Sequence, residues 1–273
     1  MAHIELVPGP AVIKQIVDES KDVKSFVLEM REGGMMDAVP GQFVEVSIQG
    51  IGEATFAVSR LVKSKKQFIV SVKRLGHLTK MLHRSAEGNL VGVRGPYGNS
   101  FPVNDWKGKD IVIIGGGIGL APLRPVIDHI MSHREEYGHL DIIFGARSPQ
   151  DILFKEDLET WQETKDLTLY TTIDIPHEGW EGRVGLIPAV VRDVNIKPDN
   201  RIAVICGPPV MIRFTVAAMQ DLGWPAERIY TTLEMKMQCG IGQCGRCNIG
   251  EKYICKDGPV FRLDEIPEYA SIE

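Results

Sequence analysis

Four of the five cysteines in this chain lie close together near its end, at a spacing suited to metal binding. The stretch QCGIGQCGRCNIGEKYICKDG, residues 238–258, contains Cys239, Cys244, Cys247 and Cys255. Their spacing, Cys-x4-Cys-x2-Cys-x7-Cys, matches plant-type iron–sulfur proteins at the first three positions. Structural zinc sites usually combine two short knuckles, and this segment has one. The spacing therefore predicts a 2Fe-2S cluster on these four thiolates, with structural zinc as the weaker alternative.

The residues between the predicted ligands favour the same interpretation. Gly240, Gly242 and Gly245 separate the first three cysteines. Glycine adopts positive φ without steric cost, so a tight loop can turn its backbone N–H groups toward cluster sulfides. A reducing compartment also disfavours disulfides between clustered thiols. We expect a loop of left-handed glycines wrapped around the metal.

A second chemical motif begins at residue 110. The stretch DIVIIGGGIGLAPLRPVIDHIMSHREE, residues 110–136, reads as a strand, a glycine turn and a helix. Such a turn can hold a phosphate at the N-terminus of the helix. The fingerprint G-x-G-x-x-G is absent, because Leu120 or Pro122 occupies its third glycine slot, so a tight crossover without ligand remains an alternative. The residues that we expect to contact a nucleotide here are Gly115, Gly116, Gly117, Gly119, Ala121 and Pro122.

Further strands and helices alternate after this motif. Strand-like runs occur at 140–147, 167–174 and 201–209, and helix-like runs at 155–164, 187–194 and 211–223. This alternation predicts a parallel sheet covered on both faces, with ligands bound beyond the carboxyl ends of the strands. Arg147 stands where an acidic ribose-binding residue is common. It can meet a 2′-phosphate or a pyrophosphate, or simply solvate a loop, so NADH and NADPH both remain open.

The first part of the chain has a different pattern. Short alternating runs at 25–30, 41–48, 67–74 and 89–98 are separated by Gly, Pro and Asn, which predicts an antiparallel barrel or sandwich. The two patterns meet at PVNDWKGKD, near residue 105. We therefore expect three parts: an antiparallel β-barrel at 1–104, an α/β parallel-sheet nucleotide domain at 105–232, and a small C-terminal iron–sulfur segment at 233–273.

Composition limits the partners. The chain has 273 residues, is 44% hydrophobic and 25% charged, and carries a formal net charge of -5. Without a block of Lys and Arg, neither nucleic acid nor an anionic membrane is the expected main partner. The N-terminal stretch shows no signal or transit pattern, and no apolar run approaches a membrane span. We expect a cytoplasmic protein without membrane insertion.

Several motifs give the chain a family resemblance. PGQF, GPYGNSF, GGGIGLAP and CGPPVM resemble the ferredoxin-NADP reductase superfamily over essentially the whole chain. The cluster segment, running into YICKDGPVF, resembles the branch of the dihydroorotate dehydrogenase electron-transfer subunit, the anaerobic sulfite reductase flavin subunit and the sulfhydrogenase gamma subunit. The short gap between Cys247 and Cys255 resembles the hydrogenase and sulfite reductase members. The resemblance implies FAD on the barrel and NADH or NADPH on the α/β domain.

The resemblance also implies particular binding residues. The first flavin motif falls on EATFAVSR, residues 53–60, where Ala54 and Ala57 replace the family's Arg and Ser, and the second falls on VKRLGHLTKML, residues 72–82. In the Cys-Gly-Pro-x-x-Met motif, Cys206 is implied to shape the hydride-transfer site. The other implied cofactor-binding residues are Phe56, Ala57 and Val58, then Val72, Arg74, Gly76, Leu78 and Thr79, and finally Gly207, Pro208 and Met211.

These features predict one function. Hydride transfer moves two electrons together, a flavin can release them singly, and a 2Fe-2S cluster carries one at a time. We expect an electron-transfer subunit that passes electrons between NAD(P)H, FAD and the cluster. Its partners would be catalytic and iron–sulfur subunits of a larger redox complex, such as a hydrogenase or a sulfite or sulfur reductase. The alternatives are a dihydroorotate dehydrogenase electron-transfer subunit, a freestanding NAD(P)H:ferredoxin reductase, and a non-redox nucleotide-binding module with zinc.

Overall fold

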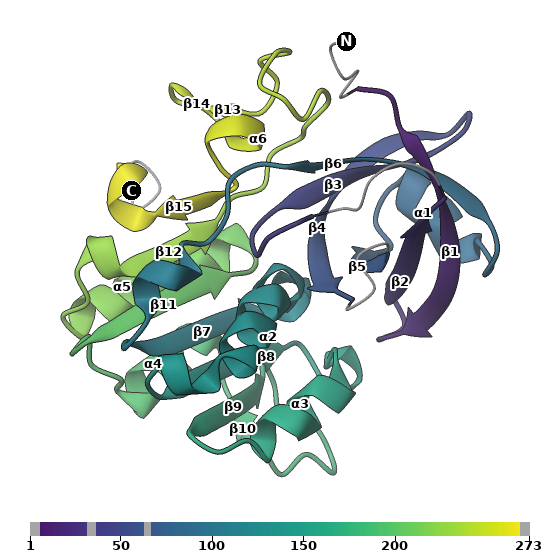
Figure 1. Cartoon of the computed structure of the whole chain (residues 1–273). Helices are drawn as coiled ribbons and strands as arrows, with labels where there is room; N and C mark the ends of the chain where they lie inside the picture. The colour runs from purple at the N-terminus through teal and green to yellow at the C-terminus, as the bar shows by residue number, and fades with distance from the viewer. Residues whose placement is uncertain (1–5, 32–36, 63–66, 268–273) are drawn as a thin grey trace. The chain divides into compact units, whose positions relative to one another are not determined.

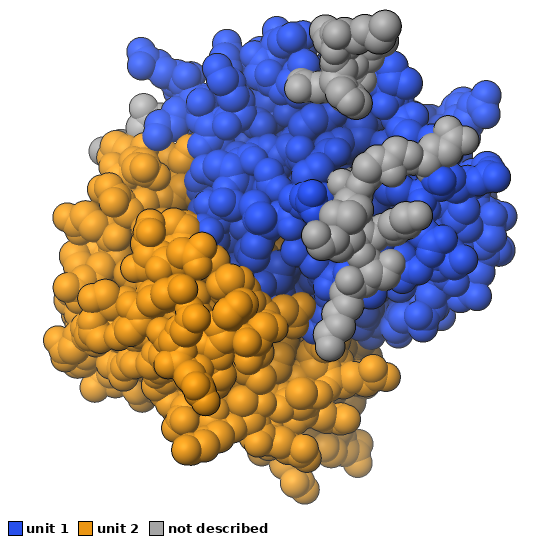
Figure 2. All heavy atoms as spheres, in the orientation of Figure 1, with its two compact units in different colours: residues 1–101, 124–126, 233–260 blue, residues 102–123, 127–232, 261–273 orange. Residues whose placement is uncertain are grey.

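The computed structural model describes residues 6–31, 37–62 and 67–267. The chain forms two compact units, shown in different colours in Figure 2. The first contains residues 1–101, 124–126 and 233–260, and the second contains residues 102–123, 127–232 and 261–273. The predicted cluster segment therefore folds largely within the same unit as the N-terminal barrel. None of the helices in the described part of the chain is long and apolar enough to cross a membrane.

The N-terminal region is a closed barrel of antiparallel strands in the order β1-β2-β5-β4-β3-β6, and β6 pairs back onto β1 (Figure 1). This selects the barrel from the two predicted architectures. The helix α1 follows β5. The elements are β1 (Gly9–Asp18), β2 (Val23–Met30), β3 (Phe43–Ile48), β4 (Gly52–Leu61), β5 (Gln67–Lys73), α1 (His77–Arg84) and β6 (Leu90–Tyr97).

The barrel interior is filled by alternate side chains of its strands. Phe26 and Leu28 of β2 and Phe68 and Val70 of β5 are at most 1% exposed. Helix α1 adds its apolar face, led by Leu78, to the same core. Because a strand places alternate residues on opposite faces, these runs showed the period of two on which the barrel prediction depends. Strands β1 and β4 lie outside the predicted runs, and each contains a register shift.

The second fold element is a seven-stranded sheet in the order β10-β9-β8-β7-β11-β12-β15. The pairs from β10 through β12 are parallel, which confirms the predicted sheet. Its strands are β7 (Asp110–Gly116), β8 (Leu140–Ala146), β9 (Leu167–Ile173), β10 (Arg183–Val184), β11 (Arg201–Cys206), β12 (Ile229–Thr232) and β15 (Val260–Arg262), and its helices are α2 (Arg124–Ser132), α3 (Lys155–Gln162), α4 (Ile187–Val194) and α5 (Pro209–Asp221).

The centre of this sheet is buried on both faces. Residues 111–114 of β7 are 0–1% exposed, as expected for a parallel strand covered by helices. One face packs on α4 and α5 through a cluster that includes Val190, Val191, Ile212 and Val216. A continuous apolar run in the sequence therefore corresponds to a strand with no polar face.

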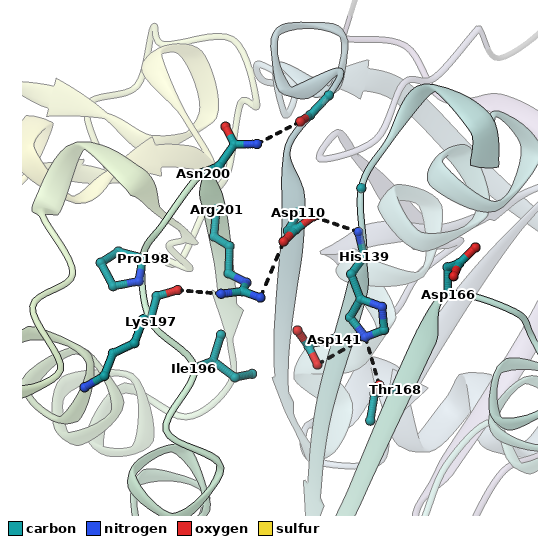
Figure 3. A network of polar contacts seen from close by, with 12 residues as sticks. Asp110, His139, Asp141, Asp166, Thr168, Ile196, Lys197, Pro198, Asn200 and Arg201 are labelled. Carbon is teal, nitrogen blue, oxygen red and sulfur yellow. Dashed lines mark hydrogen bonds and ion pairs between the residues drawn. The ribbon is translucent and has the colours of Figure 1, made fainter.

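Polar residues gather at the amino ends of the strands, shown in Figure 3. Asp110 accepts a hydrogen bond from the backbone N–H of His139 at 2.8 Å and pairs with Arg201 at 3.4 Å. His139 contacts Thr168 at 2.8 Å and the buried Asp141 at 3.6 Å. Ligands of parallel sheets bind at the opposite, carboxyl edge, so this network holds neighbouring strands together.

Replacing Asp141 with Asn is expected to remove a pH-dependent loss of unfolding free energy. Burial raises the pKa of Asp141, although His139 and Arg201 lower it. A carboxyl group whose pKa is raised in the folded state lowers the unfolding free energy of the protein as pH rises from the ordinary pKa to the raised one. The advantage of the Asn variant in unfolding free energy should therefore grow with pH across this window, measured by urea unfolding in a pH series.

Asp166→Asn is the matched control, because Asp166 has an exposed side chain and a positive φ of 58° that Asn tolerates. Equal destabilisation by Asp141→Asn at every pH would contradict the prediction.

Candidate functional site

The four clustered cysteines lie on a loop and a small hairpin. Cys239 and Cys244 belong to the loop that follows β12, and Cys244 is exposed. Cys247 precedes the hairpin of β13 (Asn248–Ile249) and β14 (Lys252–Tyr253), and Cys255 follows it in α6 (Ile254–Asp257). Both of these cysteines are 2% exposed. The hairpin therefore accounts for the seven-residue gap and returns the chain, so that Ile254 N–H donates to the carbonyl of Cys247 at 3.0 Å.

Backbone N–H groups of this loop point at sulfur. Cys239 Sγ accepts from Gln243 N–H at 3.3 Å and from Cys244 N–H at 3.4 Å, while Cys255 Sγ accepts from Gly242 N–H at 3.0 Å. The loop can turn this way because Gly240, Gly242 and Gly245 have φ values of 78°, 76° and 70°. The predicted positive φ at these three glycines is confirmed.

These contacts change the acidity of the thiols. Burial opposes ionisation of Cys239, but the N–H groups directed at its sulfur lower its pKa to about 6. Burial and the neighbouring Cys247 thiol raise the pKa of Cys255. N–H groups that stabilise a thiolate also suit a thiolate bound to metal, whose negative charge they offset.

The donor set fits an iron–sulfur cluster. The thiol of Cys239 interacts with that of Cys244, and the thiol of Cys247 with that of Cys255. Within the described residues, no three His, Cys, Asp or Glu side chains define a metal site by geometry alone. The fit therefore depends on four thiols in one short segment and on the N–H donors around them. The ligand assignment stays a prediction.

A buried arginine of the barrel holds this segment. The side chain of Arg94 on β6 is 4% exposed and pairs with Glu53, with Nε–Oε1 and Nη2–Oε2 distances of 2.8 and 2.5 Å. Arg94 also donates to the carbonyl of Gln238 at 2.6 Å and to the carbonyl of Cys239. Burial opposes its charge, but the hydrogen bonds with Glu53 and Tyr97 raise the pKa of Arg94.

A second carboxylate lies beside this pair. Glu45 is 1% exposed, is paired in register with Arg94, and accepts a hydrogen bond from Thr55 at 2.7 Å. Burial raises the pKa of Glu45 to about 7, although Thr55 and Arg94 lower it. Glu53, both of whose oxygens pair with Arg94, is the direct counter-ion of the arginine.

The motif GPYGNSF also contacts the segment. Asn99 donates through Nδ2 to the carbonyls of Asp257 at 3.0 Å and Val260 at 2.7 Å, and it accepts from Val260 N–H at 2.9 Å. Gly98 has a φ of 80°, and a Cβ there would lie 2.6 Å from Pro259. Sequence reasoning recognised this motif through its resemblance but missed its contacts and those of Arg94, which join residues about 140 or more positions apart.

The residues implied for the flavin lie on two parts of the barrel. Phe56, Ala57 and Val58 are consecutive on β4, where Phe56 is half-buried and packs on the barrel core. The N–H of Val58 donates to the carbonyl of Gln42 at 3.1 Å, so it is already engaged. Ala54 and Ala57 bring no polar side chain. The first motif therefore provides an apolar surface and little hydrogen bonding.

The second motif turns from β5 into α1. Val72 is buried and Arg74 is exposed, and nothing lies within 4 Å of a Cβ built on Gly76. Leu78 belongs to the core. Basic Arg74 and an open Gly76 at a helix start without acidic residues suit a phosphate-bearing cofactor. The residues of the second motif therefore fit the group that the resemblance implies.

The hydroxyl of Thr79 makes its hydrogen bonds within the turn before α1. It accepts from the N–H groups of Leu75 and Gly76, each at 2.9 Å, and donates to the carbonyl of Gly76 at 3.1 Å. The hydroxyl is therefore fully used in fixing the turn before α1. Thr79 shapes the predicted phosphate site indirectly, through the backbone of Gly76.

Replacing Thr79 with Val is expected to destabilise the barrel by about 1 kcal/mol, a typical cost for losing a helix-capping hydroxyl. It should also weaken flavin retention, because the loop at Gly76 loses its support. Thr79→Ser keeps the hydroxyl and is the control. Thermal unfolding and the flavin-to-protein ratio after dialysis measure both effects, and equal behaviour of the Val and Ser variants would refute the capping role.

The predicted nucleotide residues lie at one edge of the parallel sheet. The register pairs Cys206 of β11 with Gly115 of β7, and Gly116 of β7 with Gly145 of β8. The carboxyl ends of three neighbouring strands are therefore aligned, as the sequence predicted. Arg147 follows β8 at this edge and is exposed. Burial raises the pKa of the nearby Asp174, although the charge of Arg147 opposes this shift.

The glycines of the turn have unequal roles. A Cβ on Gly119 would lie 2.6 Å from both the Cys206 carbonyl oxygen and Gly207 Cα, and one on Gly116 would overlap Met211. These glycines therefore allow close packing of protein against protein. Gly117 has a φ of 54° and nothing within 4 Å of a Cβ, so it alone of the four offers open space.

The turn itself is tighter than predicted. Residues Gly117–Leu123 form a 3₁₀ turn, and the α-helix begins at Arg124. Pro122 lies inside this turn, and Ala121 is buried. Proline lacks an N–H and is favoured in a first helical turn, and Pro125 takes this place in α2. The open position at Gly117, where we predict a phosphate, is therefore on a 3₁₀ turn rather than on the first turn of the α-helix.

Cys206 lies at the end of β11 and is 4% exposed. Its sulfur accepts a hydrogen bond from the Thr232 hydroxyl at 2.9 Å, a contact that sequence reasoning missed. Gly207 and Pro208 follow it, and Met211 packs against Gly116 and Gly207 from the first turn of α5. The arrangement holds Cys206 rigidly and suits a positioning role better than nucleophilic attack.

Three known protein domains match consecutive parts of the chain. Residues 10–101 match the oxidoreductase FAD-binding domain, and residues 113–217 match the oxidoreductase NAD-binding domain. Residues 234–267 match the iron-sulfur cluster binding domain of dihydroorotate dehydrogenase B. All four clustered cysteines fall within this last match. Domains for FAD, NAD and iron–sulfur binding are therefore present in the predicted order.

Individual proteins match over most of the chain. The sulfhydrogenase 1 subunit gamma of Pyrococcus furiosus is 40% identical over 236 residues, covering 83% of this chain and 80% of that protein. A probable dihydroorotate dehydrogenase B (NAD(+)) electron transfer subunit of Methanocaldococcus jannaschii is 32% identical over 257 residues, covering 93% and 89%. A chain from the structure of an NADH-dependent reduced ferredoxin-NADP oxidoreductase, studied for flavin-based electron bifurcation, has a TM-score of 0.76 at 25% identity and covers 99% of this chain and 94% of its own.

Proposed function

The chain belongs to the family of NAD-linked flavin oxidoreductases with a dihydroorotate-dehydrogenase-type iron–sulfur domain, and we propose that it is the electron-transfer subunit of a larger redox complex. Electrons would pass between NAD(P)H and a partner enzyme, in either direction. The bound FAD and cluster would supply the conversion of paired electrons into single ones. The chain's own residues would bind and orient these groups.

The nucleotide would bind at the carboxyl edge of the parallel sheet. Gly117 leaves its backbone open to a phosphate, and Cys206, fixed by Thr232, would shape the place of the nicotinamide. Both NADH and NADPH remain substrates to test. Arg147 offers a positive charge to a 2′-phosphate, and the neighbouring Asp174 offers a carboxylate to a ribose hydroxyl.

The cluster would be of the 2Fe-2S type. Its ligands would be Cys239, Cys244, Cys247 and Cys255, at a spacing that matches plant-type sites over the first three positions. The backbone N–H groups of the loop would offset the negative charge on the sulfurs. FAD would bind to the barrel, with Phe56 on β4 and the open turn at Gly76 as its main contacts.

A separate catalytic subunit would complete the reaction. The relatives named above are subunits of a sulfhydrogenase and of a dihydroorotate dehydrogenase, so hydrogenase-type and sulfur-reducing partners head the candidates. The division of labour would follow residues 1–104 for FAD, 105–232 for the nucleotide and 233–273 for the cluster. NAD(P)H and clustered free thiols are both typical of a reducing compartment, so we place the protein in the cytoplasm.

The observation that carries this proposal is the four-cysteine segment with N–H groups directed at sulfur, joined to the barrel through Arg94 and Asn99. Anaerobic isolation from native cells, with determination of flavin, iron, sulfide and zinc and of the size of the complex, tests it. We expect flavin, iron and sulfide in a larger assembly. A colourless zinc protein would refute the redox function, and a monomer that reduces ferredoxin would favour the freestanding enzyme.

A further inference from the structure

Arg94 holds the backbone at Cys239, the first of the four predicted ligands in the cluster segment. Its guanidinium uses one edge for the two oxygens of Glu53 and turns other N–H groups to the carbonyls of Gln238 and Cys239. These carbonyls come from consecutive residues just where the segment reaches Cys239. A forked group with several donors in fixed geometry can hold two successive peptide planes, which a single-point donor cannot do.

The ring of Tyr97 also contacts Arg94 and the backbone after Cys239. The guanidinium carbon of Arg94 lies 5.5 Å from the centre of the Tyr97 ring. Gly240 packs on the same ring, since a Cβ there would lie 2.9 Å from Tyr97 Cδ2 and 3.3 Å from Arg94 Nη1. The residue after Cys239 must therefore be a glycine, both for its φ of 78° and for this close approach.

The hydrogen bonds from Arg94 set the direction of the backbone N–H groups that follow Cys239. A peptide plane is rigid, so holding the Cys239 carbonyl toward Arg94 fixes the opposite direction of the Gly240 N–H. The chain then turns at Gly240 and directs the N–H groups of Gln243 and Cys244 at Cys239 Sγ. The hydrogen bonds to Cys239 Sγ therefore depend on a backbone direction that Arg94 of the barrel fixes.

A contribution to the stability of the fold alone does not explain why a buried ion pair of Arg94 and Glu53 lies here. Removing a charged pair from water costs free energy that the pairing often only balances. Arg94 nonetheless carries its charge there, because a guanidinium stays protonated in proteins, and it donates hydrogen bonds to two carbonyls of one segment. A charge kept beside a redox segment changes the electrostatic potential there, whereas an apolar residue of similar size would only fill space.

We propose that Arg94 is a positioning residue for the iron–sulfur cluster, which fixes the backbone at Cys239 and, balanced by Glu53, sets the local charge that tunes the cluster's reduction potential. This inference rests on the proposed function, because it requires a cluster on the four cysteines. It assigns to one ion pair of the barrel two separate effects, one on retention of iron and one on potential. These effects separate under substitution.

Three variants of the full chain, prepared anaerobically, test the proposal. Arg94→Met removes both the fork and the charge, so iron should be lost to a chelator about 10- to 100-fold faster, as for other supporting residues around metal ligands, and the remaining cluster should have a lower potential. Arg94→Lys keeps the charge, so the potential should recover while iron loss stays fast. Glu53→Gln leaves the arginine charge unbalanced, so the potential should rise.

Lys14→Met is the matched control, because it breaks an exposed ion pair of the barrel with Glu29. Its iron release, EPR line shape and potential should equal those of the unaltered protein. Equal values in all variants would overturn the inference, and so would a shift in the same direction for Arg94→Met and Glu53→Gln, which would indicate a merely structural pair. Absence of iron from the unaltered protein would instead refute the proposed function.

Discussion

Replacing Cys244 with Ser is expected to reduce electron delivery from NAD(P)H to one-electron acceptors by about 100-fold or more, because a cluster that lacks one thiolate is lost or poorly held. Reduction of FAD by NAD(P)H should persist, since the nucleotide edge and the barrel are untouched. Cys244 is exposed, so the change opens no cavity in a core. Stopped-flow absorbance of the flavin and steady-state reduction of cytochrome c measure the two steps separately.

Cys206→Ser is the control for this experiment. Cys206 is the one cysteine of the sequence outside the segment, and its sulfur accepts a hydrogen bond from Thr232. The Ser variant should keep the visible and EPR spectra of the cluster, and any effect should fall on flavin reduction. Simultaneous loss of flavin reduction and acceptor reduction in Cys244→Ser would argue against separable steps.

Replacing Gly117 with Ala is expected to raise the KM for NAD(P)H by about 10-fold or more, since a Cβ would stand where a phosphate approaches the backbone. The fold should tolerate the change, because nothing lies within 4 Å of that Cβ, and the φ of 54° costs only about 1 kcal/mol for Ala. Steady-state kinetics with NADH and with NADPH, together with urea unfolding, measure both quantities.

Two other glycines serve as controls. Gly223 also has a positive φ of 88° and open space around it, at the end of α5, so Gly223→Ala should show the same small destabilisation without a change in KM. Gly119→Ala should destabilise the domain by about 1–3 kcal/mol, because its Cβ would meet backbone atoms that cannot move away. An unchanged KM in Gly117→Ala would remove this glycine from the nucleotide site.

Regular elements were predictable where local pattern decides them. The helix expected at 187–194 is observed at Ile187–Val194, and the strands at 140–147 and 167–174 are observed within a residue of their expected ends. Apolar side chains at helical or alternating spacing were enough for these assignments. The positive φ of the glycines in the cluster loop was predictable for a similar reason, since a tight loop needs the left-handed backbone that glycine adopts without strain.

The remaining features depend on contacts between distant residues or on the detailed geometry of a turn. No local pattern indicates that Arg94 on β6 holds residues 238 and 239, because the strand's sequence shows only an arginine after a valine. Thr79 was recognised by its motif, yet its hydroxyl is used by the adjacent turn. Pro122 lies in the 3₁₀ turn that precedes the helix after β7, and the predicted strand, glycine turn and helix did not include this turn. A tertiary contact decided the first of these cases, and local turn geometry decided the other two.

One measurement tests the central claim most directly, namely EPR of the anaerobically isolated protein after reduction with NADH or NADPH. The account predicts that the nucleotide, without any other reductant, produces the rhombic low-temperature signal of a reduced 2Fe-2S cluster while the flavin absorbance is bleached. A bleached flavin with no cluster signal, in protein that still contains iron and sulfide, would contradict electron passage from the nucleotide to the cysteine segment.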